Sequence, residues 1–228
     1  MVDHVPVLAI DGPSGSGKGT VSRTIARRLG WHLLDSGALY RLVALAAADS
    51  NLPLGDSEKL ARIASIMKIA FASAEDPEQV FLEGKEVSRE IRTEACGANA
   101  SRIAAQPIVR KALAARQRGF AQAPGLVADG RDMGTVVFPS AILKVFLTAS
   151  PKERALRRYK QLKHKGIDVN LAALSGHVDR RDRRDVERDV APLRPARDAR
   201  VLDSTERDVG EVVECILGWL QGTGLLSG

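Results

Sequence analysis

The chain has 228 residues, of which 44% are hydrophobic and 27% charged, a composition close to that of ordinary globular proteins that excludes a disordered or collagen-like chain. Its 34 Lys and Arg residues outnumber its 28 Asp and Glu residues, so the formal net charge is +6. This mild excess allows a nucleic acid, an anionic lipid surface or a phosphorylated small molecule as partner. The predominance of Arg (24) over Lys (10) favours the last of these, the phosphorylated small molecule, because Arg binds phosphate bidentately.

Short apolar runs alternate along the chain with longer stretches of helical periodicity, a pattern typical of an α/β fold with a parallel sheet. We interpret five runs as buried strands of this sheet: 7–11, 32–35, 126–129, 142–147 and 201–203. Pro107 is expected to open the helix that carries Arg110, because a first helical position needs no N–H donor. The segment Ser150-Pro151-Lys152-Glu153 predicts a capping box at the start of a later helix, and the apolar stripe from Val209 to Leu220 predicts the last helix.

The stretch 56–106 breaks this alternation. It contains three runs that are typical of short strands, 69–73, 80–83 and 86–88, and a hairpin across Gly84-Lys85 is expected to join the last two. The sequence therefore predicts an inserted subdomain of helices and a small antiparallel sheet. No linker separates it from the rest, so we predict a single domain over residues 1–228.

The first predicted strand is followed by a glycine-rich loop and then by a helix with an apolar face. The loop has the G-x-x-x-x-G-K spacing of a P-loop: Gly12-Pro13-Ser14-Gly15-Ser16-Gly17-Lys18-Gly19-Thr20. Such glycines let backbone N–H groups converge on phosphate oxygens, the helix N-terminus adds its positive end, and Lys18 reaches the β and γ phosphates. We therefore predict that residues 12–20 bind ATP. GTPases and motor ATPases carry a metal-binding Ser or Thr at the position of Gly19, so those classes are disfavoured, and the loop resembles that of nucleoside monophosphate kinases.

Two further segments carry charges at the ends of predicted strands. Ser36 and Arg41 follow the second strand and are candidates for binding an anion, although a capped surface helix with a solvated arginine is an equally good interpretation. The third strand ends in Asp129-Gly130-Arg131-Asp132. Because ligands bind at the carboxyl ends of parallel strands, these charges favour a binding site, with a salt-bridged turn as the alternative.

The segment from Asp179 to Asp189 holds five arginines and five acidic residues, and so carries no net charge. Arg181, Asp185 and Arg188 are spaced i, i+4, i+7, which predicts that they share one face of a helix. A solvated charged helix is the ordinary interpretation. Because these arginines accompany a phosphate-binding loop, we favour a mobile lid over residues 166–190 that closes on the substrates.

Taken together, these segments resemble the bacterial cytidylate kinases, a family of nucleoside monophosphate kinases. Besides the phosphate loop, the resemblance rests on W-H-L-L-D-S-G-A-L-Y-R, A-D-G-R-D-M-G-T-V-V-F-P, R-D-R-R-D-V-E-R-D-V-A-P-L and V-L-D-S-T. It implies a P-loop NTPase fold with a five-stranded parallel sheet, a monophosphate-binding region over 36–110 that includes the insertion, and a short lid. It also implies transfer of a phosphoryl group from ATP to CMP or dCMP, with Mg²⁺ held mainly by phosphates and water rather than by protein ligands.

The resemblance also implies roles for individual residues. The substrate-binding set would comprise Ser101, Arg110 and Asp132 for cytosine, Arg181 and Asp185 for the sugar, and Arg41, Arg131 and Arg188, with Ser36, for the acceptor phosphate. Lys18, Arg131 and Arg188 are the candidate catalytic residues, because a well-placed arginine can speed phosphoryl transfer by roughly 10³–10⁵. Arg154 or Arg157 would stack on adenine, and we assign Arg157 to the ATP site.

Other classes of protein remain open at this point. A kinase for adenylate, uridylate or shikimate would share the phosphate loop, and a nucleic-acid-binding ATPase would fit the positive charge. A non-catalytic nucleotide sensor is disfavoured, because two arginine-rich phosphate sites exceed what sensing needs. Cys96 and Cys215 are isolated and the histidines lack ligand spacing, so we predict neither a disulfide nor a structural zinc. Without a signal-peptide or membrane-span pattern, we expect a cytoplasmic monomer whose partners are ATP and CMP or dCMP, with no nucleic acid or membrane.

Overall fold

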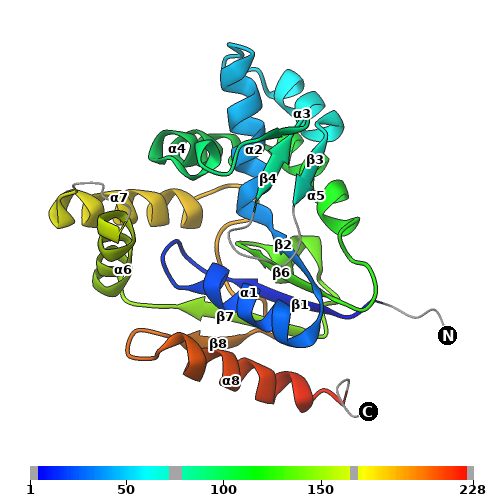
Figure 1. Cartoon of the computed structure of the whole chain (residues 1–228), viewed down its shortest axis with the longest axis vertical. Helices are drawn as coiled ribbons and strands as arrows, with labels where there is room; N and C mark the ends of the chain where they lie inside the picture. The colour runs from blue at the N-terminus through cyan, green and yellow to red at the C-terminus, as the bar shows by residue number, and fades with distance from the viewer. Residues whose placement is uncertain (1–4, 72–78, 165–168, 225–228) are drawn as a thin grey trace. The chain divides into compact units, whose positions relative to one another are not determined.

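The computed structural model describes residues 5–71, 79–164 and 169–224. The chain divides into two compact units. Unit 1 is formed by Met1–Leu34 and Ala121–Gly228, and unit 2 by Asp35–Phe120. Figure 1 labels the helices and strands of both units.

Unit 1 contains a five-stranded parallel sheet in the order β2-β6-β1-β7-β8. The strands are β1 (Val7–Asp11), β2 (His32–Asp35), β6 (Leu126–Gly130), β7 (Leu143–Thr148) and β8 (Arg200–Asp203). Every residue of β1 is buried, because this strand lies in the centre between β6 and β7. The five strands predicted from apolar runs are confirmed, each to within one residue at either end. The predicted phosphate loop therefore leaves the central strand of the sheet.

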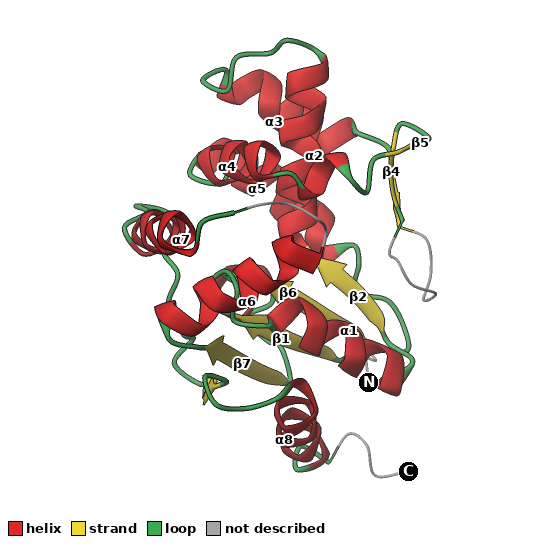
Figure 2. Cartoon of the chain, turned by 60° about the vertical axis from the view of Figure 1, so that its left-hand side comes forward, coloured by secondary structure: helices red, strands yellow, loops and turns green. Residues whose placement is uncertain are grey.

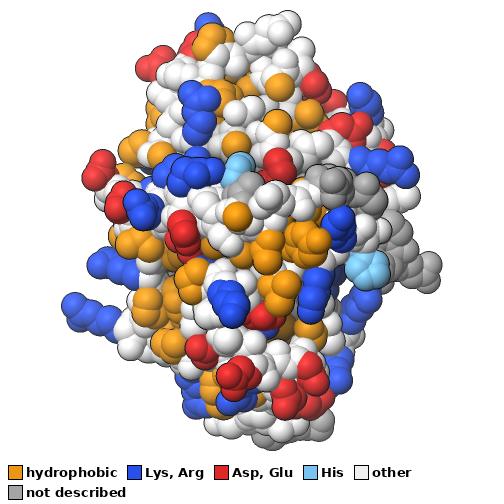
Figure 3. Space-filling model, turned by 90° about the vertical axis from the view of Figure 1, so that its left-hand side faces the viewer, with side chains coloured by type: hydrophobic (Ala, Val, Ile, Leu, Met, Phe, Trp, Pro, Cys, Tyr) orange, Lys and Arg blue, Asp and Glu red, His pale blue; other side chains and the backbone are white. Residues whose placement is uncertain are grey.

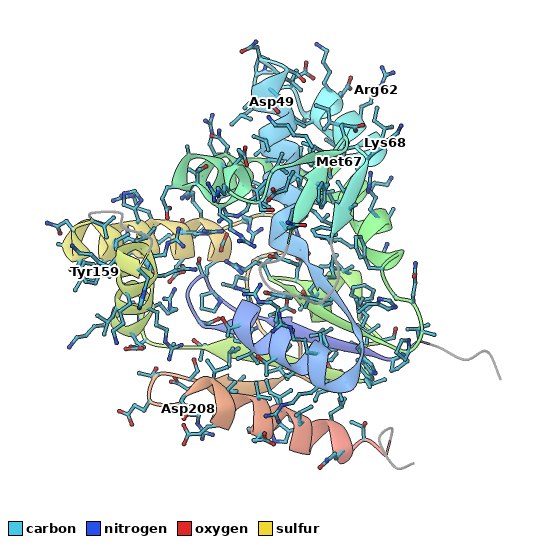
Figure 4. All side chains as sticks on the ribbon, viewed as in Figure 1. Asp49, Arg62, Met67, Lys68, Tyr159 and Asp208 are labelled. Atoms are coloured by element: carbon cyan, nitrogen blue, oxygen red, sulfur yellow. The ribbon has the colours of Figure 1, made fainter. Side chains whose placement is uncertain are left out.

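The helices of unit 1 are α1 (Lys18–Leu29), α6 (Pro151–His164), α7 (Leu171–Val186) and α8 (Val209–Gln221), with a single turn of π-helix, η2 (Met133–Val137). α1 and α8 pack on each other and on one face of the sheet (Figure 2). Their apolar side chains, such as Ile25 of α1, share one hydrophobic core with Leu8 and Ile10 of β1. The predicted last helix is confirmed, and it begins after Asp208 (labelled in Figure 4), which forms a capping box with Glu211.

The capping box predicted at Ser150 is only half formed. The Ser150 hydroxyl accepts a hydrogen bond from Glu153 N–H (3.2 Å), but Ser150 N–H donates to the Thr205 hydroxyl (2.9 Å). The Glu153 carboxylate accepts instead from Arg157 Nε (2.9 Å), one turn along α6. Contacts between distant parts of the chain have replaced the local pairing that the motif predicts.

The helix predicted through Arg188 is also shorter than expected, since α7 ends at Val186. Arg188 reaches back from the following segment, and its Nε donates to the Asp185 carbonyl oxygen (3.3 Å). The two residues are therefore neighbours without sharing a helical face. Residues 166–168 of the predicted lid lie outside the described residues.

Unit 2 combines helices with a small antiparallel sheet, as predicted. Its helices are α2 (Ser36–Asp49), α3 (Ser57–Ile66), α4 (Glu94–Ile103) and α5 (Pro107–Arg118), with one 3₁₀ turn, η1 (Glu90–Arg92). Its strands are β3 (Ile69–Phe71), β4 (Val80–Leu82) and β5 (Lys85–Glu86), in the order β3-β4-β5. α5 begins at Pro107, which confirms the prediction for that helix and places Arg110 in its first turn.

The hairpin of unit 2 turns one residue earlier than predicted. Its two loop residues are Glu83 and Gly84, with φ of 49° and 82°, and Lys85 already pairs with Leu82. A two-residue loop with positive φ at both positions matches the twist of an antiparallel pair. Glu83 therefore belongs to the turn and not to the strand, and β5 covers 85–86 rather than 86–88. Ala72 and Ser73 of the first predicted strand lie outside the described residues.

No helix in the described ranges is both long and apolar enough to cross a lipid bilayer. On the face shown in Figure 3, Lys and Arg side chains are interspersed with Asp and Glu. The net charge of +6 thus does not take the form of a single positive field on this face.

Candidate active site

The phosphate loop begins at a glycine that touches the neighbouring strand. Gly12 has φ of 155°, and a Cβ built on it would lie 2.0 Å from the Leu147 carbonyl oxygen in β7. No side chain fits in that space, so glycine is required here by packing alone. The loop is thereby fixed against the carboxyl end of the sheet, where ligands of open α/β sheets bind.

Lys18 opens α1, and its side chain turns back over the loop. Its Nζ donates to the Pro13 carbonyl oxygen (3.1 Å), and the residue is buried. Ser16 is also buried, and its hydroxyl has no hydrogen-bond partner among the residues that the structure describes. A glycine-rich loop, a helix N-terminus and an ammonium group together favour a bound phosphate. The structure thus brings the predicted ATP-binding residues 12–20 together in one loop.

Two arginines of α6 bind carbonyl oxygens of this loop. Arg154 Nη1 donates to Ser14 O (3.1 Å), and Arg157 Nη1 donates to Ser16 O (3.2 Å) and to Ser204 Oγ (3.0 Å). Ser204 Oγ itself donates to Ser16 O (3.0 Å), so the turn after β8 supports the loop as well. Sequence reasoning missed Ser204, although the V-L-D-S-T motif contains it. Stacking of Arg157 on adenine stays a prediction.

Asp11, the last residue of β1, was not among the predicted site residues. Side chains alternate along a strand, so Asp11 points to the face opposite Ile10 and meets the turn η2. Its two carboxylate oxygens accept hydrogen bonds from Met133 N–H and Gly134 N–H, both at 2.8 Å. Burial raises the pKa of Asp11 to about 6, although these two N–H donors act in the opposite direction. One buried carboxylate thus ties the strand before the phosphate loop to the turn that follows Asp132.

The raised pKa of Asp11 makes its contribution to stability depend on pH. Between its usual value near 3.8 and about 6, the unfolded chain loses the proton while the folded chain keeps it, so the folded state loses stability as the pH rises through this window. At 1.36 kcal/mol per pKa unit, the penalty above pH 6 is about 3 kcal/mol at most. We expect the thermal midpoint of the wild type, relative to that of Asp11→Asn, to fall between pH 4 and pH 7. The difference between the two thermal midpoints cancels the effect of the other carboxyl groups, which both proteins share. A difference that stays constant between pH 4 and pH 7 would contradict the prediction.

Three predicted arginines of unit 1 surround the carboxylate of Asp185. Arg131 Nε donates to Asp185 Oδ2 (3.0 Å), and Arg188 Nη2 lies 3.4 Å from Asp185 Oδ1. Burial by itself raises the pKa of Asp185, but the guanidinium groups of Arg131, Arg188 and Arg181 outweigh it and hold the pKa below its usual value. The structure therefore brings the predicted sugar and phosphate ligands of this unit together, in a cluster suited to anions.

Asp132 directly follows Arg131 in the chain, and it is buried, with 4% of its surface exposed. Its carbonyl oxygen accepts from Val136 N–H (2.9 Å) and Val137 N–H (3.2 Å), which closes the π-helical turn. Short π-helical segments are rare and are frequently found at functional sites. The turn fixes the backbone that carries Asp132.

The predicted substrate-binding residues of unit 2 lie on three helices. Ser36 Oγ, at the start of α2, accepts from Gln117 Nε2 (2.8 Å). Arg110 of α5 is buried, donates from Nη1 to Ala104 O (2.9 Å) and lies over the Tyr40 ring, with Cζ 5.8 Å from its centroid. The Ser101 hydroxyl on α4 is buried, with no hydrogen-bond partner in the described ranges.

Arg41, also on α2, is the fourth of these residues. Its Nη1 donates to the carbonyl oxygens of Ile91 (2.7 Å) and Thr93 (3.4 Å). Sequence reasoning left open whether this arginine is solvated. The structure shows that it is partly buried and anchored to backbone carbonyls.

One buried carboxylate near the loop is chemically suited to a magnesium ion. No group of three His, Cys, Asp or Glu gathers as a metal site among the described residues. The buried carboxylate of Asp129 does lie beside the loop, since a Cβ on Gly19 would be 3.3 Å from its Oδ2. Carboxylate oxygen is the donor that Mg²⁺ prefers, commonly through a bound water.

Comparison with known proteins identifies the family. Residues 8–221 match the family model "Cytidylate kinase". The chain is 59% identical over 215 residues to the cytidylate kinase of Pseudomonas paraeruginosa, covering 93% of this chain and 94% of the relative. It is 55% identical over 224 residues to that of Nitrosococcus oceani, covering 97% and 99%. A gluconokinase structure from Sinorhizobium meliloti 1021 shares the fold, with a TM-score of 0.50, 15% identity and 99% coverage of both chains. The phosphate loop on a five-stranded parallel sheet is thus that of a P-loop kinase, and the chain belongs to the cytidylate kinase family.

Proposed function

We propose that this chain phosphorylates CMP and dCMP with ATP, by direct transfer of the γ-phosphoryl group to an oxygen of the monophosphate. The bond between the γ-phosphorus and ADP breaks as the new bond forms, and the products are ADP and CDP or dCDP. Membership of the cytidylate kinase family is the observation that carries this function. It also favours a kinase over the nucleic-acid-binding ATPase and the nucleotide sensor as interpretations of the phosphate loop.

In the proposed mechanism the protein supplies alignment and positive charge, because phosphoryl transfer needs little covalent help. Lys18 binds the β and γ phosphates of ATP, which residues 12–20 hold. Arg131 and Arg188 span the donor and acceptor phosphates and stabilise charge on the transferred group. Their pairing with Asp185 supports this role, because it holds two long side chains in a defined position before substrate arrives.

The remaining residues recognise the acceptor nucleotide and distinguish CMP and dCMP from other nucleoside monophosphates. Cytosine has an N4 amino donor, which suits the carboxylate of Asp132, and N3 and O2 acceptors, which suit Arg110 and Ser101. The buried Ser101 hydroxyl supports this assignment, because a buried polar group without a partner is costly unless a ligand satisfies it. We assign Arg181 and Asp185 to the sugar, and Ser36 and Arg41 to the acceptor phosphate. Residues 166–190 act as the lid.

Magnesium accompanies ATP in this proposal. When bound, Mg²⁺ neutralises charge on the β and γ phosphates. Phosphate oxygens and water would supply most of its ligands, and Asp129 would hold the ion through one of those waters. Thr20, the hydroxyl after Gly19, is exposed and is not assigned to the ion.

We further propose that the enzyme works in the cytoplasm as a monomer, with nucleotides as its partners and without nucleic acid or membrane. One observation on the described residues supports the cytoplasmic location. Cys96 and Cys215 are free thiols, as suits a reducing compartment.

A panel of nucleoside monophosphates tests the proposed function. Each of CMP, dCMP, UMP and AMP is offered with ATP and Mg²⁺, and ADP formation is followed in a coupled assay. We expect CMP and dCMP to give the highest kcat/KM. Faster turnover of AMP or UMP would overturn the assignment, as would ATP hydrolysis that RNA or DNA stimulates.

A further inference from the structure

The guanidinium group of Arg41 lies against a position of α4 that has no side chain. A Cβ built on Gly97 would lie 2.9 Å from Arg41 Nη2, 3.0 Å from Nη1 and 3.2 Å from Cζ. Ordinary van der Waals contact begins at about 3.5 Å. Gly97 is buried and lies one helical turn beyond Thr93, whose carbonyl oxygen accepts both Gly97 N–H (3.0 Å) and Arg41 Nη1 (3.4 Å). The arginine therefore occupies the space that a side chain at position 97 would fill.

Neither the backbone nor the helix explains a glycine at this position. The φ angle of Gly97 lies outside the left-handed region, so any L-residue can adopt the backbone conformation. Within a helix, glycine is less favourable than alanine by about 0.5–1 kcal/mol. Outside the helix's own backbone, the three atoms nearest to the built Cβ all belong to the Arg41 guanidinium.

We propose that Gly97 is a positioning residue for the acceptor phosphate, because its missing side chain lets the Arg41 guanidinium approach α4 and bond to Ile91 and Thr93. The inference rests on the proposed function, in which Arg41 binds that phosphate. The neighbouring residue adds to the same arrangement, since Cys96 Sγ donates to the Arg41 carbonyl oxygen (3.3 Å). Two consecutive residues of α4 thus contact the backbone and the side-chain end of Arg41.

The proposal predicts opposite effects of Gly97→Ala on stability and on substrate use. The contacts of the new methyl group are with the far end of a flexible side chain, so the guanidinium moves and the helix does not. The thermal midpoint should stay equal to that of the wild type or rise, because alanine favours the helix. KM for CMP should rise by about tenfold to a hundredfold, since a displacement of about 1 Å at a positioning group can cost that much. KM for ATP should stay within about twofold.

The matched control is Gly218→Ala in α8. Gly218 is also within a helix, and a Cβ built on it meets nothing within 4 Å. This variant should gain helix stability without any change in KM for CMP. It separates the helical preference of alanine from the contact with arginine.

A double-mutant cycle tests whether Gly97 acts through Arg41. Arg41→Met should raise KM for CMP, and adding Gly97→Ala to Arg41→Met should raise it no further, because the displaced group is already absent. Independent, additive effects of the two substitutions would overturn the inference. So would a lowered thermal midpoint of Gly97→Ala, which would assign the glycine to packing.

The two proposals fail in different ways. If Arg41→Met impairs the use of CMP and Gly97→Ala matches the wild type, the inference on Gly97 is wrong and the role of Arg41 stands. If Arg41→Met itself leaves KM for CMP unchanged, the proposed role of Arg41 is wrong, and the inference falls with it.

Discussion

Replacing Arg131 by Met is expected to lower kcat for CMP phosphorylation by roughly 10³-fold, the lower end of the effect of an arginine that stabilises a transferred phosphoryl group. The fold should persist, because Asp185 keeps the guanidinium of Arg188 at 3.4 Å as a partner. KM for ATP should change much less than kcat, because residues 12–20 still hold the ATP phosphates and the contact of Arg131 with them is strongest in the transition state. The coupled ADP assay with saturating CMP and ATP measures the effect.

The control is Arg62→Met on α3, an exposed arginine labelled in Figure 4, which should keep the turnover of the wild type. It removes the same charge from the chain without touching a proposed ligand. Near-normal kcat of Arg131→Met would remove this residue from the catalytic set. If kcat of Arg131→Met falls only because the variant is less stable, as a lowered thermal midpoint would show, Arg131 also leaves the catalytic set.

The second large effect is expected from Asp132→Ala. Loss of a charged hydrogen bond to the cytosine N4 amino group should lower kcat/KM for CMP by about 10²-fold, the upper end of the range for such bonds. UMP offers a carbonyl oxygen at that position, which a carboxylate repels, so its kcat/KM should hold or rise. The preference for CMP over UMP should therefore collapse, and the nucleotide panel measures both values.

Asp132→Asn serves as the conservative comparison. Its side-chain oxygen still accepts a hydrogen bond from N4, so it should recover part of the preference for CMP. ATP binding should be intact in both variants, which titration with an ATP analogue checks. Equal loss of ATP binding and CMP use would show that Asp132 supports the site as a whole rather than the base.

The parts of the fold that the sequence predicted well are those that depend on burial alone. A central strand buried on both faces needs a nearly continuous apolar run, so Val7–Ile10 marked β1 without knowledge of its neighbours, and only Asp11 at its end is charged. The boundaries that failed depend on geometry. Glu83 adopts a positive φ, which side-chain chemistry does not predict, and α7 ends before Arg188 although the charge spacing continues.

The candidate site shows the same division. Motif spacing found the loop at 12–20 and the arginines around Asp185, because phosphate requires these residue types. Asp11 and Ser204 were missed, because each acts through a partner more than a hundred residues away in the chain. Gly97 was missed for another reason. A single sequence shows only that position 97 is a glycine. It does not show that the guanidinium of Arg41 occupies the space where a side chain would lie.

The central place of β1 has a consequence for synthesis of the chain. Val7 pairs with Leu126, and Ser16 is supported by Ser204, so the first strand and its loop acquire their partners only late in translation. At about 5–20 residues per second, the wait for Leu126 alone is on the order of 10 s. Unit 2 is a continuous segment, 35–120, and is complete on the ribosome before that strand has a neighbour. We therefore expect ATP to stabilise only nascent chains that are nearly full length. A chain released before that point would not be protected against proteolysis by the nucleotide.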